Sequence, residues 1–204
     1  MSSALNSARG FPGAVRRCTS RVEPSIGRSS NSRSLPSPEE TGSTFEENAA
    51  LKALYFATAT GMVTIADDSG LEVDVLGGAP GVYSSRYAGR EGDDAANNAK
   101  LLAELGDRPD EMRGGRFRTA ICLASPGDVH LMTTGSVEGR ILHAPRGDGG
   151  FGYDPLFFHP GFGRAFAELS SEEKASVSHR GQALDDLKRH LPALLSILRN
   201  RRSF

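Results

Sequence analysis

The sequence predicts an α/β protein, with α+β as the alternative, because stretches with helical and with strand periodicity alternate along the chain and polar turns separate them. Two capping-box patterns, at residues 44–47 and 170–173, each predict the start of a helix. Two β-rich runs flank Ser-Pro-Gly-Asp at 125–128, a sequence typical of a hairpin turn. Together these observations predict helices packed on a mixed sheet.

The expected elements follow one another along most of the chain. The first part has a helix from Thr44 that ends at Gly61, a short strand at 62–66 bounded by a polar turn at 67–70, and a glycine-rich loop with short ordered pieces at 71–92. A helix at 93–105, capped by Asp93 or Asp94, precedes strands at 116–124 and 129–137, the second prolonged by 138–142. A glycine-rich stretch at 147–154, a short helix after Ser170 and a last helix from about 181 to 199 complete the chain.

Composition excludes several classes of protein. The chain has 204 residues, enough for one domain with a sizeable core or for two small lobes. No apolar run of about 18 residues is present, so we expect no membrane span. A net charge of −1 argues against a broad surface for nucleic acid. Two cysteines, Cys18 and Cys122, form neither a zinc pattern nor a disulfide framework, which favours a cytoplasmic protein.

Residues 1–38 differ from the rest of the chain. They are rich in serine and arginine and show no sustained apolar period. This composition predicts a poorly ordered tail, with a targeting peptide as the alternative. The folded domain is then expected to occupy residues 39–204.

The segment Asp67-Asp68-Ser69-Gly70 follows an apolar run and has two interpretations. Two adjacent acids at the end of a strand can hold Mg²⁺, which prefers oxygen ligands. Asp, Ser and Gly are equally typical of a plain turn. The four residues alone leave both interpretations open.

Two further segments are candidates for ligand binding. Residues 149–155, Gly-Gly-Phe-Gly-Tyr-Asp-Pro, combine glycines that allow close backbone approach with an aromatic that can stack on a base. The alternative is a tight turn beside core aromatics. In the second segment Lys174, His179 and Arg180 are candidates for phosphate or base contacts, and a solvated helix surface is the alternative.

In combination these segments resemble the Ham1 family of inosine and xanthosine triphosphate pyrophosphatases. The resemblance covers roughly residues 38–200, in family order and spacing. The matching stretches are 40–49, 66–71, 76–86, 150–157, 167–170 and 178–180.

The resemblance implies a fold, an activity and a site. The fold would be elongated and two-lobed, with a long mixed β-sheet flanked by helices, an active site in the central cleft, and usually a homodimer. The activity would be Mg²⁺-dependent hydrolysis of ITP, dITP or XTP to the monophosphate and pyrophosphate. Asp68 would be catalytic and would bind Mg²⁺ with Glu40. The substrate-binding residues would be Ser69, Lys52, Phe151, Gly152, Tyr153, Asp154, Lys174, His179 and Arg180, with His179 and Arg180 favouring a 6-oxo purine.

One family feature has no match in residues 1–43. Members open with a strand and a Thr/Ser-x-Asn-x-x-Lys turn that binds the triphosphate, whereas no lysine precedes Lys52 here. We therefore expect residues 1–38 to replace the natural N-terminus, as a misassigned reading frame would, and we expect activity to be reduced by orders of magnitude.

Three other functions remain as alternatives. A non-catalytic nucleotide binder would keep the base pocket without hydrolysis. A Maf-like pyrophosphatase would act on other nucleotides. A structural protein would leave the Asp68 segment and both glycine-rich loops without a purpose.

Overall fold

The computed structural model describes residues 35–201, which form helices on both sides of one long sheet. The predicted tail thus lies almost entirely outside the described residues. The elements are α1 (Phe45–Thr60), β1 (Thr64–Val73), η1 (Asp74–Leu76), η2 (Gly81–Arg86), α2 (Asp94–Leu105), η3 (Asp110–Met112), β2 (Gly114–Ser125), β3 (Asp128–Ile141), β4 (Phe157–His159), β5 (Arg164–Ala165), η4 (Phe166–Glu168), α3 (Ser171–Val177) and α4 (His179–Arg201).

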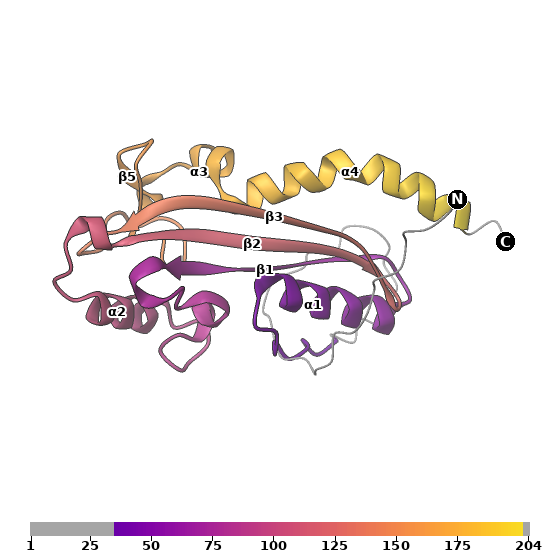
Figure 1. The fold of residues 1–204 in the computed structure, drawn as a ribbon, viewed down its shortest axis with the longest axis horizontal. Coiled ribbons are helices and arrows are strands. Elements are labelled where there is room, and N and C mark those ends of the chain that lie inside the picture. The colour runs from indigo at the N-terminus through magenta and orange to yellow at the C-terminus, as the bar shows by residue number, and fades with distance from the viewer. Residues whose placement is uncertain (1–34, 202–204) are drawn as a thin grey trace, which may run out of the picture.

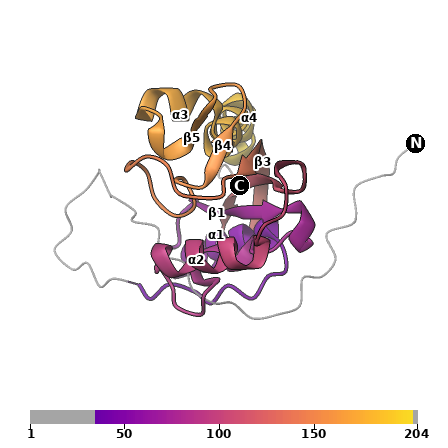
Figure 2. The same cartoon turned by 90° about the vertical axis from the view of Figure 1, so that its left-hand side faces the viewer.

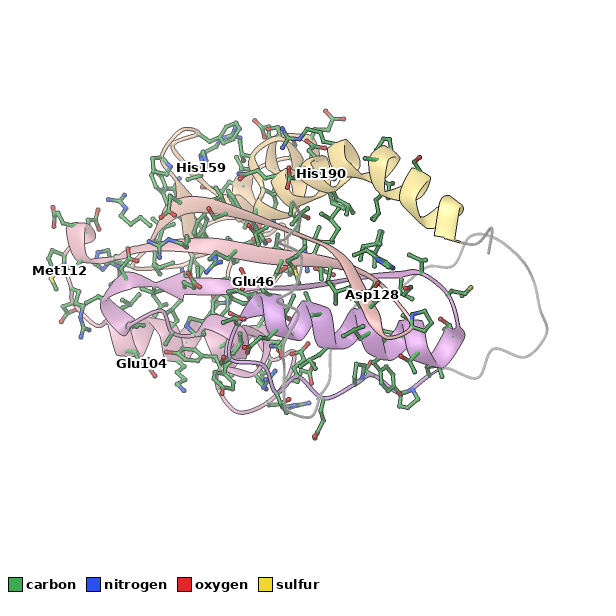
Figure 3. All side chains as sticks on the ribbon, turned by 45° about the vertical axis from the view of Figure 1, so that its right-hand side comes forward. Glu46, Glu104, Met112, Asp128, His159 and His190 are labelled. Atoms are coloured by element: carbon green, nitrogen blue, oxygen red, sulfur yellow. The ribbon has the colours of Figure 1, made fainter. Side chains whose placement is uncertain are left out.

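The sheet has the order β1-β2-β3-β4-β5. The three long strands run side by side through the middle of the molecule, with Met112 and Asp128 near opposite ends of the sheet (Figures 1 and 3). Every pairing among residues 35–201 is antiparallel, so the predicted mixed sheet is not found there. A fold that combines helices with one β-sheet is confirmed, and the sheet is antiparallel.

Helices cover both faces of this sheet. Helices α1 and α2 lie on one side, and α3 and α4 lie on the other (Figures 1 and 2). Strand β2 is therefore buried on both faces. Its residues alternate, as a strand requires: Ala120, Cys122 and Ala124 pack in the cluster under α1, whereas Ile121 and Leu123 pack in the cluster under α4.

The predicted helix starts are largely confirmed. The Thr44 side chain accepts from the Glu47 amide, and left-handed Gly61 ends α1. Ser170 and Glu173 form the predicted capping box of α3. Helix α4 begins at His179, two residues earlier than expected.

The predicted turn at residues 67–70 is wrong, because these residues lie inside β1. Asp67 pairs with Ile121 and Asp68 with Ala120, in a ladder of ten residues with β2. Long-range pairing here overrides local turn preference. Position 70 of this strand requires glycine, because a side chain there would collide with Ser84 and with the backbone of η2.

Within residues 35–201, every helix is too short or too polar to cross a lipid bilayer.

Candidate active site

A cavity of about 600 Å³ runs along the edge strand β1 and is walled by η2, by the loop at 150–154 and by the α3–α4 corner. Small-molecule sites commonly have volumes of about 300–1,000 Å³. The cavity is thus large enough for a nucleotide-sized ligand.

A buried ion cluster lies at one part of the cavity wall. The Lys52 Nζ donates to Glu40 Oε1 at 2.9 Å and to Asp68 Oδ1 at 2.8 Å. The Asn48 Nδ2 donates to the other Asp68 oxygen at 3.2 Å. Asn48 and Lys52 are one helical turn apart on α1, so one face of this helix holds the Asp68 carboxylate.

Burial controls the protonation of Asp68. Removal from water raises its pKa to about 6, while the Lys52 charge and its hydrogen bond act against this rise. The carboxylate is therefore mostly ionised at neutral pH, and its pKa lies within reach of that pH. This suits a group that accepts a proton or binds a cation.

Asp67 is held from the opposite side of the sheet. Its Oδ2 accepts from Arg180 Nε at 3.1 Å and lies 3.0 Å from Arg180 Nη2. Arg180 belongs to the first turn of α4, whereas the partners of Asp68 belong to α1. Neighbouring strand residues point to opposite faces. The two acids are consequently held by different helices, although both line the cavity.

Ser69 is tied to the next strand. Its hydroxyl lies 2.7 Å from the Thr119 hydroxyl, which also donates to the Asp68 carbonyl at 3.2 Å. These contacts link the β1 backbone at Asp68 to β2.

The glycine-rich loop at 150–154 is organised by Asp154. Its Oδ2 accepts from the Phe151 amide at 2.9 Å and also from Lys174 Nζ. Gly150 has a φ of +75° and stands against the Asp154 carboxylate, where a side chain would collide. The Tyr153 hydroxyl donates to the Ser84 carbonyl at 2.9 Å, and its ring lies in the core.

Phe151 is the exposed aromatic of this loop, with 65% of its surface accessible. The Lys174 Nζ lies 4.9 Å from its ring centroid, and the Arg180 guanidinium carbon lies 5.8 Å away. Two cations therefore flank an aromatic face at the cavity.

His179 is buried against the core. Its ring stacks on Phe117 with centroids 5.2 Å apart. Burial, reinforced by Arg180 and Lys174, lowers its pKa to about 3, so the ring is neutral at pH 7. Its Nδ1 is buried and has no hydrogen-bond partner among the described residues. A buried polar atom of this kind favours a partner supplied by a ligand.

Gly135 on β3 allows His179 to lie this close to the sheet. A side chain at Gly135 would overlap the His179 carbonyl. The Thr133 hydroxyl of β3 donates a hydrogen bond to the Ala183 carbonyl at 3.0 Å, which holds the next turn of α4 against the sheet.

The structure brings the predicted site residues together with one exception. Lys52 does not line the cavity; it lies behind Asp68 and is 2% exposed. The residues that line the cavity as predicted are Glu40, Asp68, Ser69, Phe151, Gly152, Tyr153, Asp154, Lys174, His179 and Arg180.

Sequence reasoning missed several residues at this site. Asn48 holds Asp68, and Thr119 holds Ser69. Asp94 of α2 lines the cavity and accepts from the Gly152 amide at 2.7 Å. The four-residue spacing of Asn48 and Lys52 could have indicated a shared face; Thr119 and Asp94 carry no local signal.

The donor set fits a magnesium ion held partly by its substrate. Glu40 and Asp68 present carboxylate oxygens around one ammonium group at the cavity wall. No cluster of three or more His, Cys, Asp or Glu forms in the described part of the chain. Mg²⁺ commonly uses one or two carboxylates together with phosphate oxygens and water, so Glu40 and Asp68 are the residues here that could hold it.

Comparison with known proteins identifies a family. The Ham1 family profile matches residues 16–190, beginning upstream of residue 39. A dITP/XTP pyrophosphatase of Lactobacillus acidophilus is 51% identical over 178 residues, covering 86% of this chain and 88% of the relative. The HAM1 protein of Coxiella burnetii matches with a TM-score of 0.73 and 46% identity, over 78% of this chain and 82% of that chain. The Ham1 protein of Staphylococcus aureus gives 0.72 and 45%, over 76% and 80%.

Proposed function

Because this chain belongs to the Ham1 family, we propose that it hydrolyses non-canonical purine nucleoside triphosphates, namely ITP, dITP and XTP, to the monophosphate and pyrophosphate. The chain is a nucleoside-triphosphate diphosphatase like its relatives, which are dITP/XTP pyrophosphatases.

The observation that carries this proposal is the joining of two sites in one cavity. The Glu40–Lys52–Asp68 cluster supports phosphate and metal chemistry, and the Phe151–Lys174–Arg180 group supports binding of a base. The two carboxylates of the first group and all three residues of the second line the same 600 Å³ cavity. A nucleoside triphosphate needs both functions at one site.

The proposed chemistry centres on Asp68. Its carboxylate lies at the cavity wall, where it can orient a water molecule and accept a proton from it. Bound Mg²⁺, held by Asp68 and Glu40, would supply neutralisation of the phosphate charge. Lys52 fixes both carboxylates from behind, so we assign it a positioning role and not a direct reach to the phosphates.

The proposed base recognition uses the α3–α4 corner. Phe151 offers a stacking face, and Lys174 and Arg180 offer donors to a 6-oxo purine. Neutral His179 has one unpartnered ring nitrogen available for the base. The 6-amino group of adenine presents a donor to these donors, so ATP should be rejected. Ser69, Gly152, Tyr153 and Asp154 complete the pocket by placing these groups.

We further propose, on the family resemblance, an elongated two-lobed arrangement with a central cleft, a homodimer and a cytoplasmic location. Light scattering after gel filtration tests the dimer, and a monomer at micromolar concentration would contradict it.

A second candidate function is nucleotide binding without hydrolysis. It is favoured by one observation, the absence of a lysine before Lys52 and hence of the family's phosphate-binding turn. Pyrophosphate release from ITP and XTP with Mg²⁺, set beside a binding titration with the same nucleotides, separates the two. Release with turnover supports hydrolysis, and binding without release supports the second candidate.

A further inference from the structure

The first turn of α2 contacts the glycine-rich loop at Gly152. The Gly152 amide donates to Asp94 Oδ2 at 2.7 Å, and Asn98 Nδ2 donates to the Gly152 carbonyl at 2.8 Å. A donor and an acceptor of one loop residue are therefore both satisfied by a helix more than 50 residues earlier in the sequence.

The helix is arranged so that both side chains are available for this contact. Asp93 is the N-cap of α2, accepting from the Ala96 amide at 3.1 Å, which leaves the Asp94 carboxylate for the loop. Asp94 and Asn98 are one turn apart and share a helix face. The Asn98 Nδ2 also donates to the Asp94 carbonyl at 2.8 Å, so both of its contacts are acceptors and its amide orientation is fixed.

Two glycines on either side of Phe151 give the loop backbone freedom that its contacts must restrict. Gly150 and Gly152 both adopt positive φ, at +75° and +60°, a region in which glycine has wide freedom. Asp154 restrains the loop from within through the Phe151 amide and Lys174. Phe151 lies between these two sets of contacts and is itself exposed.

We propose that Asp94 and Asn98 are positioning residues that set the place of Phe151, and with it the affinity of the cavity for a purine base. This inference rests on the proposed function of the cavity. Neither side chain reaches the Glu40–Lys52–Asp68 cluster, so they act on binding of the base and leave the hydrolytic step intact.

Steady-state kinetics of variants separate an effect on binding of the base from an effect on the hydrolytic step. Asp94→Ala removes the acceptor for the Gly152 amide, and Asn98→Ala removes the donor to its carbonyl. Asn98→Asp keeps the shape but places a carboxylate against that carbonyl. Each should raise KM for ITP about tenfold, the effect of one lost hydrogen bond, and change kcat by less than about threefold.

The matched control is Asp93→Ala. It removes the same charge from the adjacent residue and weakens the helix cap, whereas the hydrogen bond of the Asp93 side chain goes to the Ala96 amide within α2. Its KM for ITP should stay at the wild-type value even where its Tm falls. A merely structural role of α2 would make this control resemble Asp94→Ala.

Hydrogen–deuterium exchange of the peptide spanning residues 149–155 gives a readout that does not depend on activity. We expect faster exchange at Phe151 and Gly152 in Asp94→Ala and Asn98→Ala, and unchanged exchange in Asp93→Ala. Asp94 is exposed, so the Asp94→Ala variant should fold.

The outcomes are distinguishable from those of the proposed function. If wild type does not hydrolyse ITP, the proposed function fails. The exchange measurement still decides whether Asp94 and Asn98 restrain the loop at residues 149–155. If folded Asp94→Ala and Asn98→Ala show wild-type exchange in the loop and wild-type KM, the positioning role is overturned. An equal fall of kcat in Asp94→Ala, Asn98→Ala and the control Asp93→Ala, with KM unchanged, would overturn the positioning role as well.

Discussion

Asp67 and Asp68 are neighbours in β1, yet their carboxylates are held from opposite faces of the sheet, by Arg180 of α4 and by Lys52 of α1. The two carboxylates therefore have different roles. Asp68 belongs to the carboxylate–lysine cluster, whereas Asp67 fixes the arginine beside the base pocket.

This division predicts different kinetics for two identical substitutions. Asp68→Asn removes the proposed base and metal ligand, and should lower kcat for ITP by about 10²–10⁴-fold. Asp67→Asn removes only the charge that holds Arg180, and should act mainly on KM. Steady-state kinetics with saturating Mg²⁺ measure both. Equal losses of kcat in the two variants would contradict the assignment.

Lys52 is predicted to be necessary for stability as well as for activity. Lys52→Met leaves the buried Glu40 and Asp68 carboxylates without their shared cation, which should cost about 3–5 kcal/mol of unfolding free energy at pH 7.5. Loss of the lysine charge raises the pKa of Asp68 further, so the deficit should shrink as pH falls and the carboxylates take up protons.

Urea unfolding at pH 7.5 and pH 5.5 tests this expectation, with Lys52→Arg as the variant that keeps the charge. A Lys52→Met deficit that is equal at both pH values would show that the charge is not the cause.

Gly135 is predicted to fix the position of His179. Gly135→Ala places a methyl group against the His179 carbonyl, and overpacking of this kind costs about 1–3 kcal/mol. Ser136→Ala, at the exposed neighbouring position of β3, is the control. Thermal unfolding should separate the variants, and KM for ITP should rise only in Gly135→Ala.

His179 predicts a pH dependence of stability with a definite sign. Its pKa is lowered from 6.5 to about 3, so between these pH values the unfolded chain binds a proton that the folded chain does not. Its contribution to stability is therefore lost as pH falls from 6.5. Asp68, with a raised pKa, contributes with the opposite sign, so wild type must be compared with His179→Asn.

The free energy of unfolding of wild type relative to His179→Asn should fall by up to about 1.4 kcal/mol per pH unit between pH 6.5 and 4. Denaturant titrations at four pH values measure this slope. A difference that does not change with pH would mean that His179 is not held neutral by its surroundings.

The sequence predicted most helix starts, because caps such as Thr44 and Ser170 act locally. It placed a turn at Asp67–Gly70, because those residues are turn formers and only the ladder with β2 keeps them extended. Local preference cannot report a partner strand about 50 residues away. The mixed sheet was predicted from the alternation of helices and strands as well as from the family resemblance, and the described pairings are antiparallel.

The site was predicted as a set of residues but not as a geometry. Family motifs named Glu40, Lys52 and Asp68, and the structure adds that the lysine lies between the two carboxylates and away from the cavity. Asn98 was not predicted, because its contact with Gly152 depends on how a helix and a distant loop come together. Motifs indicate which residues matter, while packing decides which of them can touch a ligand.

The most direct test of the account is pyrophosphate release from ITP, XTP and ATP by the full chain with Mg²⁺ at pH 7.5, measured beside Asp68→Asn. We expect kcat/KM for ITP and XTP to exceed the value for ATP by about 10²-fold or more, and Asp68→Asn to lower the rate with ITP by about 10²-fold or more. Equal rates for the three nucleotides, or release no faster than that of Asp68→Asn, would contradict it.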